Sequence, residues 1–351
     1  MNSNNEALAL YLPRQNKDSS NHIKVLAGDI GGTKTNLGLF ESVDGKMNLL
    51  HENTYHSQKF PTFTAIVHQF LLDTENEKPE RISIGVAGPV INKTVQTTNL
   101  PWQIDAASLQ KETGTKEVAL LNDLEANAYG LAGLTEDDIV TVYDGEKNTP
   151  GNIAIIAPGT GLGEAALFWD GKNYHPFATE GGHCSFAQES DLDIKLYRYL
   201  HKKYKIVSWE HLVSGPAIYM IYKFLRDVKK MEEPHWLDVR LNADDPSAVI
   251  SNTALEGLSE ICDATMKLFT HYLSRECYNL VLKIKATGGL YLGGGIPPKI
   301  EKYIRSKDFY ASFKQSDRMD DLISRISIKL IINSKTALMG AAYYGAFGEA
   351  Q

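Results

Sequence analysis

IKVLAGDIGGTKTNLGLF, residues 23–40, consists of an apolar run, a glycine-rich turn and a second apolar run. The first run is typical of a buried strand, and the second predicts another strand directly after the turn. Asp44-Gly45 follows and predicts a hairpin to a third strand, because both central residues of such a turn need positive φ. We therefore expect Asp29 to lie at the end of a buried strand, where a turn begins.

The same series of features returns later in the chain. NIAIIAPGTGLGEAALFW, residues 152–169, is again a buried-strand run, a glycine-threonine turn and an outgoing apolar run. Such internal similarity indicates duplicated structural units. Because 351 residues exceed one ordinary domain, we predict an α/β protein of two related lobes that face each other, with a nucleotide between them.

The rest of the chain alternates strands and helices. RISIGVAGPV and EVALL predict further strands, and GLYLGGGIPP predicts a buried strand that ends in a third glycine turn. Residues 1–22 are mostly polar and are expected to form a tail. Helical spacing of apolar residues is expected over residues 62–72, 124–131, 192–204, 215–229, 253–282 and 336–347.

Composition narrows the function classes. The hydrophobic share of 43% and charged share of 23% are typical of a globular protein with a full core. A net charge of -7 disfavours nucleic acid and anionic membranes as partners, so a nucleotide would be held by local amides, a metal ion and a few cations. Three cysteines, without a disulfide framework or a membrane-helix run, predict a cytoplasmic protein with free thiols.

Three glycine turns are candidates for nucleotide binding. Glycine lets the backbone approach a phosphate and point its N–H groups at it, and Asp29 could hold Mg²⁺ directly or through water. A plain hairpin is the alternative reading of each turn, and neither a Walker A loop nor a Rossmann fingerprint is present. The candidates are Gly31, Gly32 and Thr33, then Gly159, Thr160 and Gly161, and finally Gly294 and Gly295, which could pass beneath an adenine or ribose.

A second set of polar residues suits a sugar. Asn122 and Asp123 follow a strand and could bind a hydroxyl and accept its proton, although helix capping is the stronger expectation from these two residues alone. Glu180, His183 and Glu210 supply the donors and acceptors that a ring of hydroxyls requires. Zinc at His183 is not expected, because the adjacent Cys184 cannot easily share one tetrahedral site.

Taken together, GDIGGTKTNLGL, LLNDLEANAYGL, APGTGLG, EGGH, SWEHLVSGP and YLGGGI occur in the order seen in bacterial glucokinases of the hexokinase-like superfamily. The chain resembles that family from about Val25 to Ala346. The resemblance implies the two-lobed actin-like ATPase (ribonuclease H-like) fold with a cleft between the lobes. We expect a small α/β domain at 23–132, completed by the C-terminal helix 335–351, and a large α/β domain at 133–334.

The resemblance also assigns roles to individual residues. It implies that Asn99, Asn122, Asp123, Glu180, His183 and Glu210 bind glucose, and that Asp123 is the base toward the 6-hydroxyl. It gives the turns at Gly31–Thr33 and Gly159–Gly161 to the phosphates of ATP, with Asp29 near Mg²⁺. The cysteine-rich zinc motif of the related repressor and open-reading-frame kinases is missing, so structural zinc is not expected.

The function predicted is therefore transfer of the γ-phosphoryl group of ATP to glucose. A kinase for another hexose or N-acetylhexosamine and a non-catalytic sugar sensor on the same fold are the alternatives, and a chaperone-like ATPase is a third. The sensor is disfavoured because Asp123 and both phosphate turns are retained, and because the polar segment before residue 23 is too short for a helix-turn-helix. The sequence is compatible with a homodimer.

Overall fold

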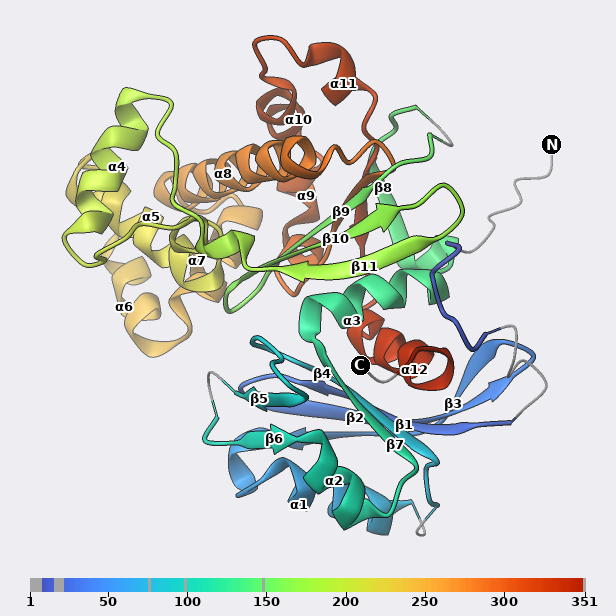
Figure 1. Ribbon diagram of the computed structural model, residues 1–351. Coiled ribbons are helices and arrows are strands. Elements are labelled where there is room, and N and C mark those ends of the chain that lie inside the picture. The colour runs from blue at the N-terminus through green and yellow to red at the C-terminus, as the bar shows by residue number, and fades with distance from the viewer. Residues whose placement is uncertain (1–7, 16–21, 75–76, 98–99, 147–148, 350–351) are drawn as a thin grey trace. The chain divides into compact units, whose positions relative to one another are not determined.

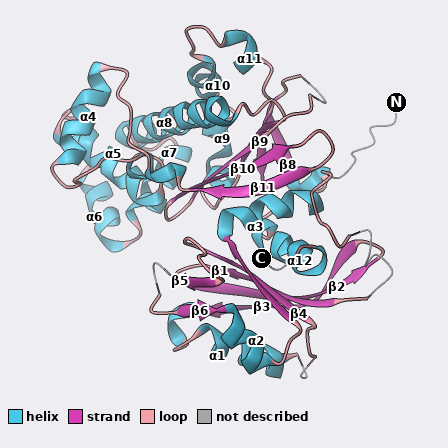
Figure 2. Cartoon of the chain, in the orientation of Figure 1, coloured by secondary structure: helices cyan, strands magenta, loops and turns pink. Residues whose placement is uncertain are grey.

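The computed structural model describes residues 8–15, 22–74, 77–97, 100–146 and 149–349 (Figure 1). It divides into two compact units. Unit 1 comprises Met1–Asp138, Ala165–Ala178 and Asn333–Gln351, and unit 2 comprises Ile139–Glu164 and Thr179–Ile332. Each unit is built on a sheet flanked by helices, as the predicted α/β class requires (Figure 2).

Unit 1 contains a five-stranded sheet in the order β3-β2-β1-β4-β7. The predicted hairpins are present, with Asp44 and Gly45 at φ of 50° and 76° between β2 and β3. β1 pairs antiparallel with β2 and parallel with β4, which pairs parallel with β7. The strands are β1 (Lys24–Ile30), β2 (Lys34–Val43), β3 (Lys46–His56), β4 (Arg81–Val86) and β7 (Glu117–Asn122), and a separate two-stranded sheet joins β5 (Thr94–Gln96) to β6 (Gln103–Asp105).

Helices cover both faces of the unit 1 sheet (Figures 1 and 2). On one face α1 (Phe63–Asp73) and α2 (Ala106–Thr113) enclose a core with Trp102, and on the other lie α3 (Asp123–Gly130) and α12 (Thr336–Phe347). α3 and α12 approach closely, since a Cβ on Gly340 would lie 1.8 Å from the carbonyl oxygen of Ala126. This confirms that the small residues of α12 serve close packing.

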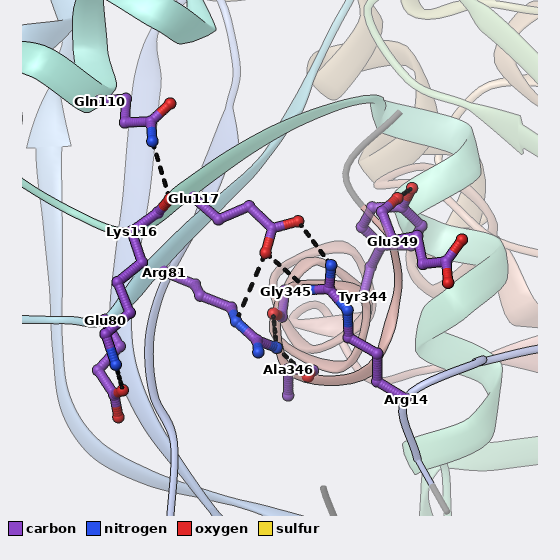
Figure 3. A network of polar contacts seen from close by, with 10 residues as sticks. All are labelled: Arg14, Glu80, Arg81, Gln110, Lys116, Glu117, Tyr344, Gly345, Ala346 and Glu349. Carbon is purple, nitrogen blue, oxygen red and sulfur yellow. Dashed lines mark hydrogen bonds and ion pairs between the residues drawn. The ribbon is translucent and has the colours of Figure 1, made fainter. Parts of the chain in front are cut away.

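Residues 8–15, within the segment expected to be a tail, pack against unit 1. Leu10 and Leu12 are 5% and 7% exposed, and Arg14 forms an ion pair of 2.6 Å with Glu117. Figure 3 shows the guanidinium of Arg81 on the other side of the same carboxylate, at 3.6 Å. The apolar side chains of this short run supply the burial that orders it.

Unit 2 contributes to a six-stranded sheet in the order β11-β10-β9-β12-β13-β8. Its first five strands repeat the order of the unit 1 sheet, with two hairpin strands followed by β9, β12 and β13 in parallel. This agrees with the duplication predicted from the two glycine-turn segments. The strands are β8 (Ile139–Tyr143), β9 (Ile153–Pro158), β10 (Leu162–Trp169), β11 (Tyr174–Thr179), β12 (Gly289–Leu292) and β13 (Ile328–Ile331).

The helices of unit 2 surround one large apolar core. The helix expected over residues 253–282 is two helices, because Gly257 at φ 72° ends the first and the chain restarts after Ser259. None of the described helices is long and apolar enough to cross a membrane. The helices are α4 (Asp191–His201), α5 (Gly215–Asp227), α6 (His235–Ala243), α7 (Pro246–Leu255), α8 (Glu260–Ile284), α9 (Glu301–Ile304), α10 (Lys307–Lys314) and α11 (Asp320–Ser324).

Candidate active site

Strand register brings the unit 1 candidates to one edge of its sheet. Ile30 at the end of β1 lies opposite Val86 of β4, and Val86 lies opposite Asn122 of β7. The three strands are parallel, so their carboxyl ends meet at the same edge, where ligands of open α/β sheets bind. Asp29, one residue before Ile30, therefore shares this edge with Asn122.

Asp29 is a half-buried carboxylate at the start of the first glycine turn. It accepts a long hydrogen bond of 3.4 Å from Asn36 Nδ2, and burial raises its pKa above the ordinary value. The turn itself is held by the Gly31 N–H, which donates to the carbonyl of Lys34 at 2.9 Å, and by Ser57 Oγ, which donates to the Gly31 carbonyl at 3.0 Å. A cation near Asp29 would compensate the buried charge.

Asn122 caps helix α3, as its residue type predicts. Its Oδ1 accepts from the backbone N–H groups of Leu124 and Glu125 at 2.9 and 3.4 Å, and its Nδ2 donates to the carbonyl of Gly88 at 3.3 Å. Asp123 is the first residue of α3, and its Oδ1 accepts from the Leu124 N–H at 3.0 Å. Asn99 lies outside the described residues.

Glu210 lies beside the second glycine turn, in unit 2. Its Oε2 accepts a hydrogen bond of 2.9 Å from the N–H of Leu162, the first residue of β10. A Cβ on Gly161 would lie 2.5 Å from that same oxygen, so the carboxylate contacts the turn directly. Glu210 belongs to a short 3-10 helix, Trp209–His211, which is anchored by the buried Trp209.

Glu180 and His183 lie together on an exposed bend. The bend is a 3-10 turn, Gly181–His183, and the side chains of Glu180 and His183 are 61% and 62% exposed. Glu180 Oε2 is 3.9 Å from His183 Nε2. Gly182 packs onto β10, because a Cβ there would lie 2.2 Å from the Leu162 carbonyl. Gly182 of the bend and Glu210 therefore both contact Leu162, the first residue of β10.

The second glycine turn lies at the start of α5. The Gly159 N–H donates to the Gly161 carbonyl at 2.8 Å, and the Gly215 N–H, in the first turn of α5, donates to the Gly159 carbonyl at 2.8 Å. The N-terminus of a 13-residue helix favours negative charge, which suits a phosphate near Thr160. The sequence predicted the helix but not this proximity.

The third glycine turn is joined to the end of β9, next to the second. The Gly293 N–H donates to the Ile156 carbonyl at 2.8 Å, and the Ile296 N–H donates to the Pro158 carbonyl at 3.3 Å. Gly294 has φ of 79° and leaves no room for a side chain, since a Cβ would lie 2.5 Å from the Pro158 carbonyl. Unit 2 therefore gathers Gly159–Gly161, Glu180, His183, Glu210, Gly294 and Gly295 around the ends of two adjacent strands.

Comparison with known proteins adds to this geometry. The glucokinase family model matches residues 26–346, which is nearly the whole described chain. The chain belongs to the glucokinase family. Among its relatives, it is 38% identical to a glucokinase of Nostoc punctiforme over 336 residues, which are 92% of this chain and 98% of the relative.

Solved glucokinase structures share the fold of this family member. A glucokinase from an Antarctic psychrotroph superposes with a TM-score of 0.79 at 30% identity, covering 92% of this chain and 98% of that one. A ROK family glucokinase from Streptomyces griseus, solved with glucose and AMPPNP, has a TM-score of 0.63 at 19% identity over 92% and 98% of the two chains. The predicted two-lobed, actin-like architecture is confirmed.

Proposed function

We propose that this glucokinase-family enzyme transfers the γ-phosphoryl group of ATP to the 6-hydroxyl of glucose. The observation that carries the proposal is the family match over residues 26–346, a range that includes Asp123, Glu180 and Glu210. The donor is supported by the Streptomyces griseus relative, which was solved with the ATP analogue AMPPNP. Cys184, Cys262 and Cys277 are free thiols, and we propose that the protein works in the cytoplasm, where thiols stay reduced.

Glucose would be recognised by groups that can pair with each hydroxyl. We assign this role to Asn99, Asn122, Asp123, Glu180, His183 and Glu210. Glu180 and His183 are exposed and can each turn toward a ligand, whereas Glu210 is already oriented by the N–H of Leu162. A sugar that lacks one of these hydroxyls would leave a polar partner unpaired, which is how such a site selects its substrate.

Asp123 is the proposed general base. Its carboxylate lies at the N-terminus of α3, where capping by Asn122 holds the first turn in place. The carboxylate accepts the backbone N–H of Leu124 at 3.0 Å, which orients it, and it would accept the proton of the 6-hydroxyl as the phosphoryl group transfers. A helix N-terminus also stabilises the anionic form of this base.

The phosphates would be held by backbone N–H groups of Gly31–Thr33 and Gly159–Gly161. The Thr160 side chain is exposed and can donate to a transferring oxygen, and the N-terminus of α5 favours the accumulating negative charge. Gly294 and Gly295 expose a bare backbone that suits a flat adenine or ribose. These assignments make unit 2 the main holder of the nucleotide.

The residues at the first turn fit Mg²⁺. Asp29 is a poorly hydrogen-bonded, half-buried carboxylate, and Mg²⁺ is usually held by one or two carboxylates, water and substrate phosphates. We propose that Asp29 holds the ion through water. When bound with ATP, Mg²⁺ neutralises charge on the phosphate oxygens.

A coupled phosphorylation assay tests the function. Purified protein with ATP and Mg²⁺ should turn over glucose with the highest kcat/KM among glucose, mannose, fructose and N-acetylglucosamine, and should hydrolyse little ATP without sugar. A preference for another sugar would replace glucose as the substrate. ATP hydrolysis that no sugar stimulates would contradict the proposal.

A further inference from the structure

Two buried carboxyl groups face each other beneath the bend that carries Glu180 and His183. Glu164, in β10, is 1% exposed, and Glu276, in α8, is fully buried. Burial, and after it the charge of the nearby Glu276, raise the pKa of Glu164. Two adjacent carboxylates cannot both ionise easily away from water, so such a pair shares a proton.

The hydrogen-bond partners indicate which group holds the proton. Glu276 Oε2 accepts from Asn279 Nδ2 at 2.9 Å, and its Oε1 accepts from Lys283 Nζ at 3.3 Å. Glu164 Oε1 has no partner among the described residues. These two partners favour the charged form of Glu276, against burial, which raises its pKa. Burial and the neighbouring Glu276 raise the pKa of Glu164 to about 8, and Glu164 has no such partners, so we place the proton on Glu164.

The other ionisable groups around the pair do not neutralise it. Lys283 is half-exposed and reaches Glu276 from the same helix, and Cys277 is a buried thiol whose pKa is raised by burial and by both carboxyl groups. Glu180 and His183, on the bend above, point into solvent. One half-exposed ammonium thus faces two buried carboxyl groups.

The fold alone does not require an acid at this position. The two glycine turns can be matched by the carbonyl that accepts the N–H of the turn, which belongs to Lys34 in unit 1 and to Gly161 in unit 2. Counting three residues on from each carbonyl leads to Leu37 in unit 1 and Glu164 in unit 2. Both side chains are buried and lie in the strand that follows the turn. Because a leucine fills the matching position in unit 1, packing alone does not explain the carboxyl group of Glu164.

Glu164 contacts the sugar-binding bend through Gly181. A Cβ on Gly181 would lie 1.9 Å from Glu164 Oε2, so the backbone of the bend rests directly on the carboxyl group. Thr179 Oγ1 also ties the two together, since it donates to the Glu164 carbonyl and accepts from the Gly181 N–H, each at 3.1 Å. A displacement of the Glu164 carboxyl group would therefore displace Gly181, the residue next to Glu180.

We propose that Glu164 is a positioning residue whose proton, shared with Glu276, holds the Gly181 bend in the form that binds sugar. The inference rests on the proposed function of Glu180 and His183. When the shared proton is lost, two negative charges meet in a buried place, and separating or hydrating them requires Gly181 to move. Glucose binding therefore weakens at alkaline pH while nucleotide binding is retained.

The pH dependence of KM in a neutral variant tests this positioning role. In the wild-type enzyme, KM for glucose should rise above pH 8, by roughly 30-fold at pH 9.5 if the protonated form alone binds, with KM for ATP and kcat at saturating glucose changing much less. Glu164→Gln keeps the shape and cannot ionise, so its KM for glucose should stay nearly flat. A Gln variant that follows the wild-type profile would overturn the proposal.

Two further variants keep the test decisive if Glu164→Gln folds poorly. Glu276→Gln removes the second negative charge, so loss of the Glu164 proton no longer brings two charges together and the rise in KM should be much smaller. Glu256→Gln, at an exposed position of the same unit, should leave the wild-type profile unchanged. A full wild-type rise in KM in Glu276→Gln contradicts the shared proton.

Hydrogen exchange separates this inference from the proposed function. Protection factors of the amides in residues 179–184 should fall above pH 8 in the wild-type protein and remain constant in Glu164→Gln, without any sugar present. If the wild-type protein turns over no glucose, the proposed function fails, but this exchange result still decides whether Glu164 holds the bend. Equal protection in both proteins at all pH values would refute the positioning role.

Discussion

Glu210 accepts the backbone N–H of Leu162 at 2.9 Å, so a proposed sugar ligand also holds the strand that leaves the second glycine turn. The same oxygen lies against Gly161. The proposed sugar site and the proposed phosphate turn are therefore linked through one carboxylate. This link distinguishes Glu210 from Glu180, whose side chain is exposed on its bend.

Glu210→Ala should weaken both substrates. Each polar group left unpaired, the glucose hydroxyl and the Leu162 N–H, costs about 1–3 kcal/mol, so Kd for glucose should rise by about 5- to 150-fold and Kd for ATP severalfold. Glu210→Gln can still accept the Leu162 N–H through its amide oxygen and serves as the matched control, with ATP affinity near wild type. Calorimetric titration with each ligand measures both affinities, and an unchanged Kd for ATP in Glu210→Ala would contradict the link.

Glu180→Ala should affect glucose alone. Its carboxylate contacts neither glycine turn of unit 2 in the described hydrogen bonds, so the loss of a hydroxyl partner should raise KM for glucose steeply and leave nucleotide affinity nearly unchanged. Equilibrium titration of the variant with each ligand measures this. Unchanged glucose affinity, or an equal loss for ATP, would remove Glu180 from the sugar site.

Asp123→Asn should abolish most phosphoryl transfer while preserving sugar binding. The amide retains the shape and one acceptor for the Leu124 N–H, but it cannot take the hydroxyl proton, and a general base contributes about 10²–10⁴-fold. We expect kcat to fall by that factor with little change in Kd for glucose or in melting temperature. Turnover close to wild type would exclude Asp123 as the base.

Stability should fall as pH rises from about 5 to 8. The carboxyl group of Glu164 has a raised pKa of about 8 in the folded protein against 4.5 for an unperturbed group, so the folded state binds the proton more tightly. Its contribution is complete below the unfolded pKa and is lost as pH approaches the folded one, at up to about 1.4 kcal/mol per pH unit.

Urea titrations across this range measure the slope. Glu164→Gln should flatten it, and because burial also raises the pKa of Glu125 to about 7, part of the slope should remain in the variant. Identical slopes in both proteins would show that Glu164 is ionised throughout.

Arg14→Ala should lower stability without altering activity. The guanidinium forms two hydrogen bonds with Glu117, at 2.6 and 3.2 Å, and the pair is three-quarters buried. A bidentate, partly buried pair of this kind is worth on the order of 1 kcal/mol, so the melting temperature should drop by a few degrees. Lys172→Ala, an exposed position in unit 1, is a suitable control. An unchanged melting temperature would mean that the segment contributes nothing.

Much of this architecture could be predicted because the decisive elements carry strong local patterns. The runs that became β1 and β9 are almost wholly apolar, and Asp44-Gly45 selects its turn by backbone preference. α6 was not predicted, since Leu237 and Leu241 alone face the core. The break between α7 and α8 was missed because apolar spacing continues across Gly257.

The site was predictable where polar residues adjoin glycine turns, and less so where tertiary contacts decide. Nothing in the sequence shows that the Leu162 N–H pairs with Glu210, or that the start of α5 reaches Gly159. Glu164 stands in an otherwise apolar strand, and such an isolated charge in a buried run is the signal that could have revealed it.

The shared strand order of the two sheets has an evolutionary consequence. Two descendants of one ancestral module can diverge independently, and here the first has an acidic residue before its turn, Asp29, where the matching position of the second is the buried Ile156. The second acquired a buried acid after the turn, Glu164, where the first remained apolar. With the roles that we propose for Asp29 and Glu164, one ancestral hairpin would serve a cation in one copy and a proton in the other.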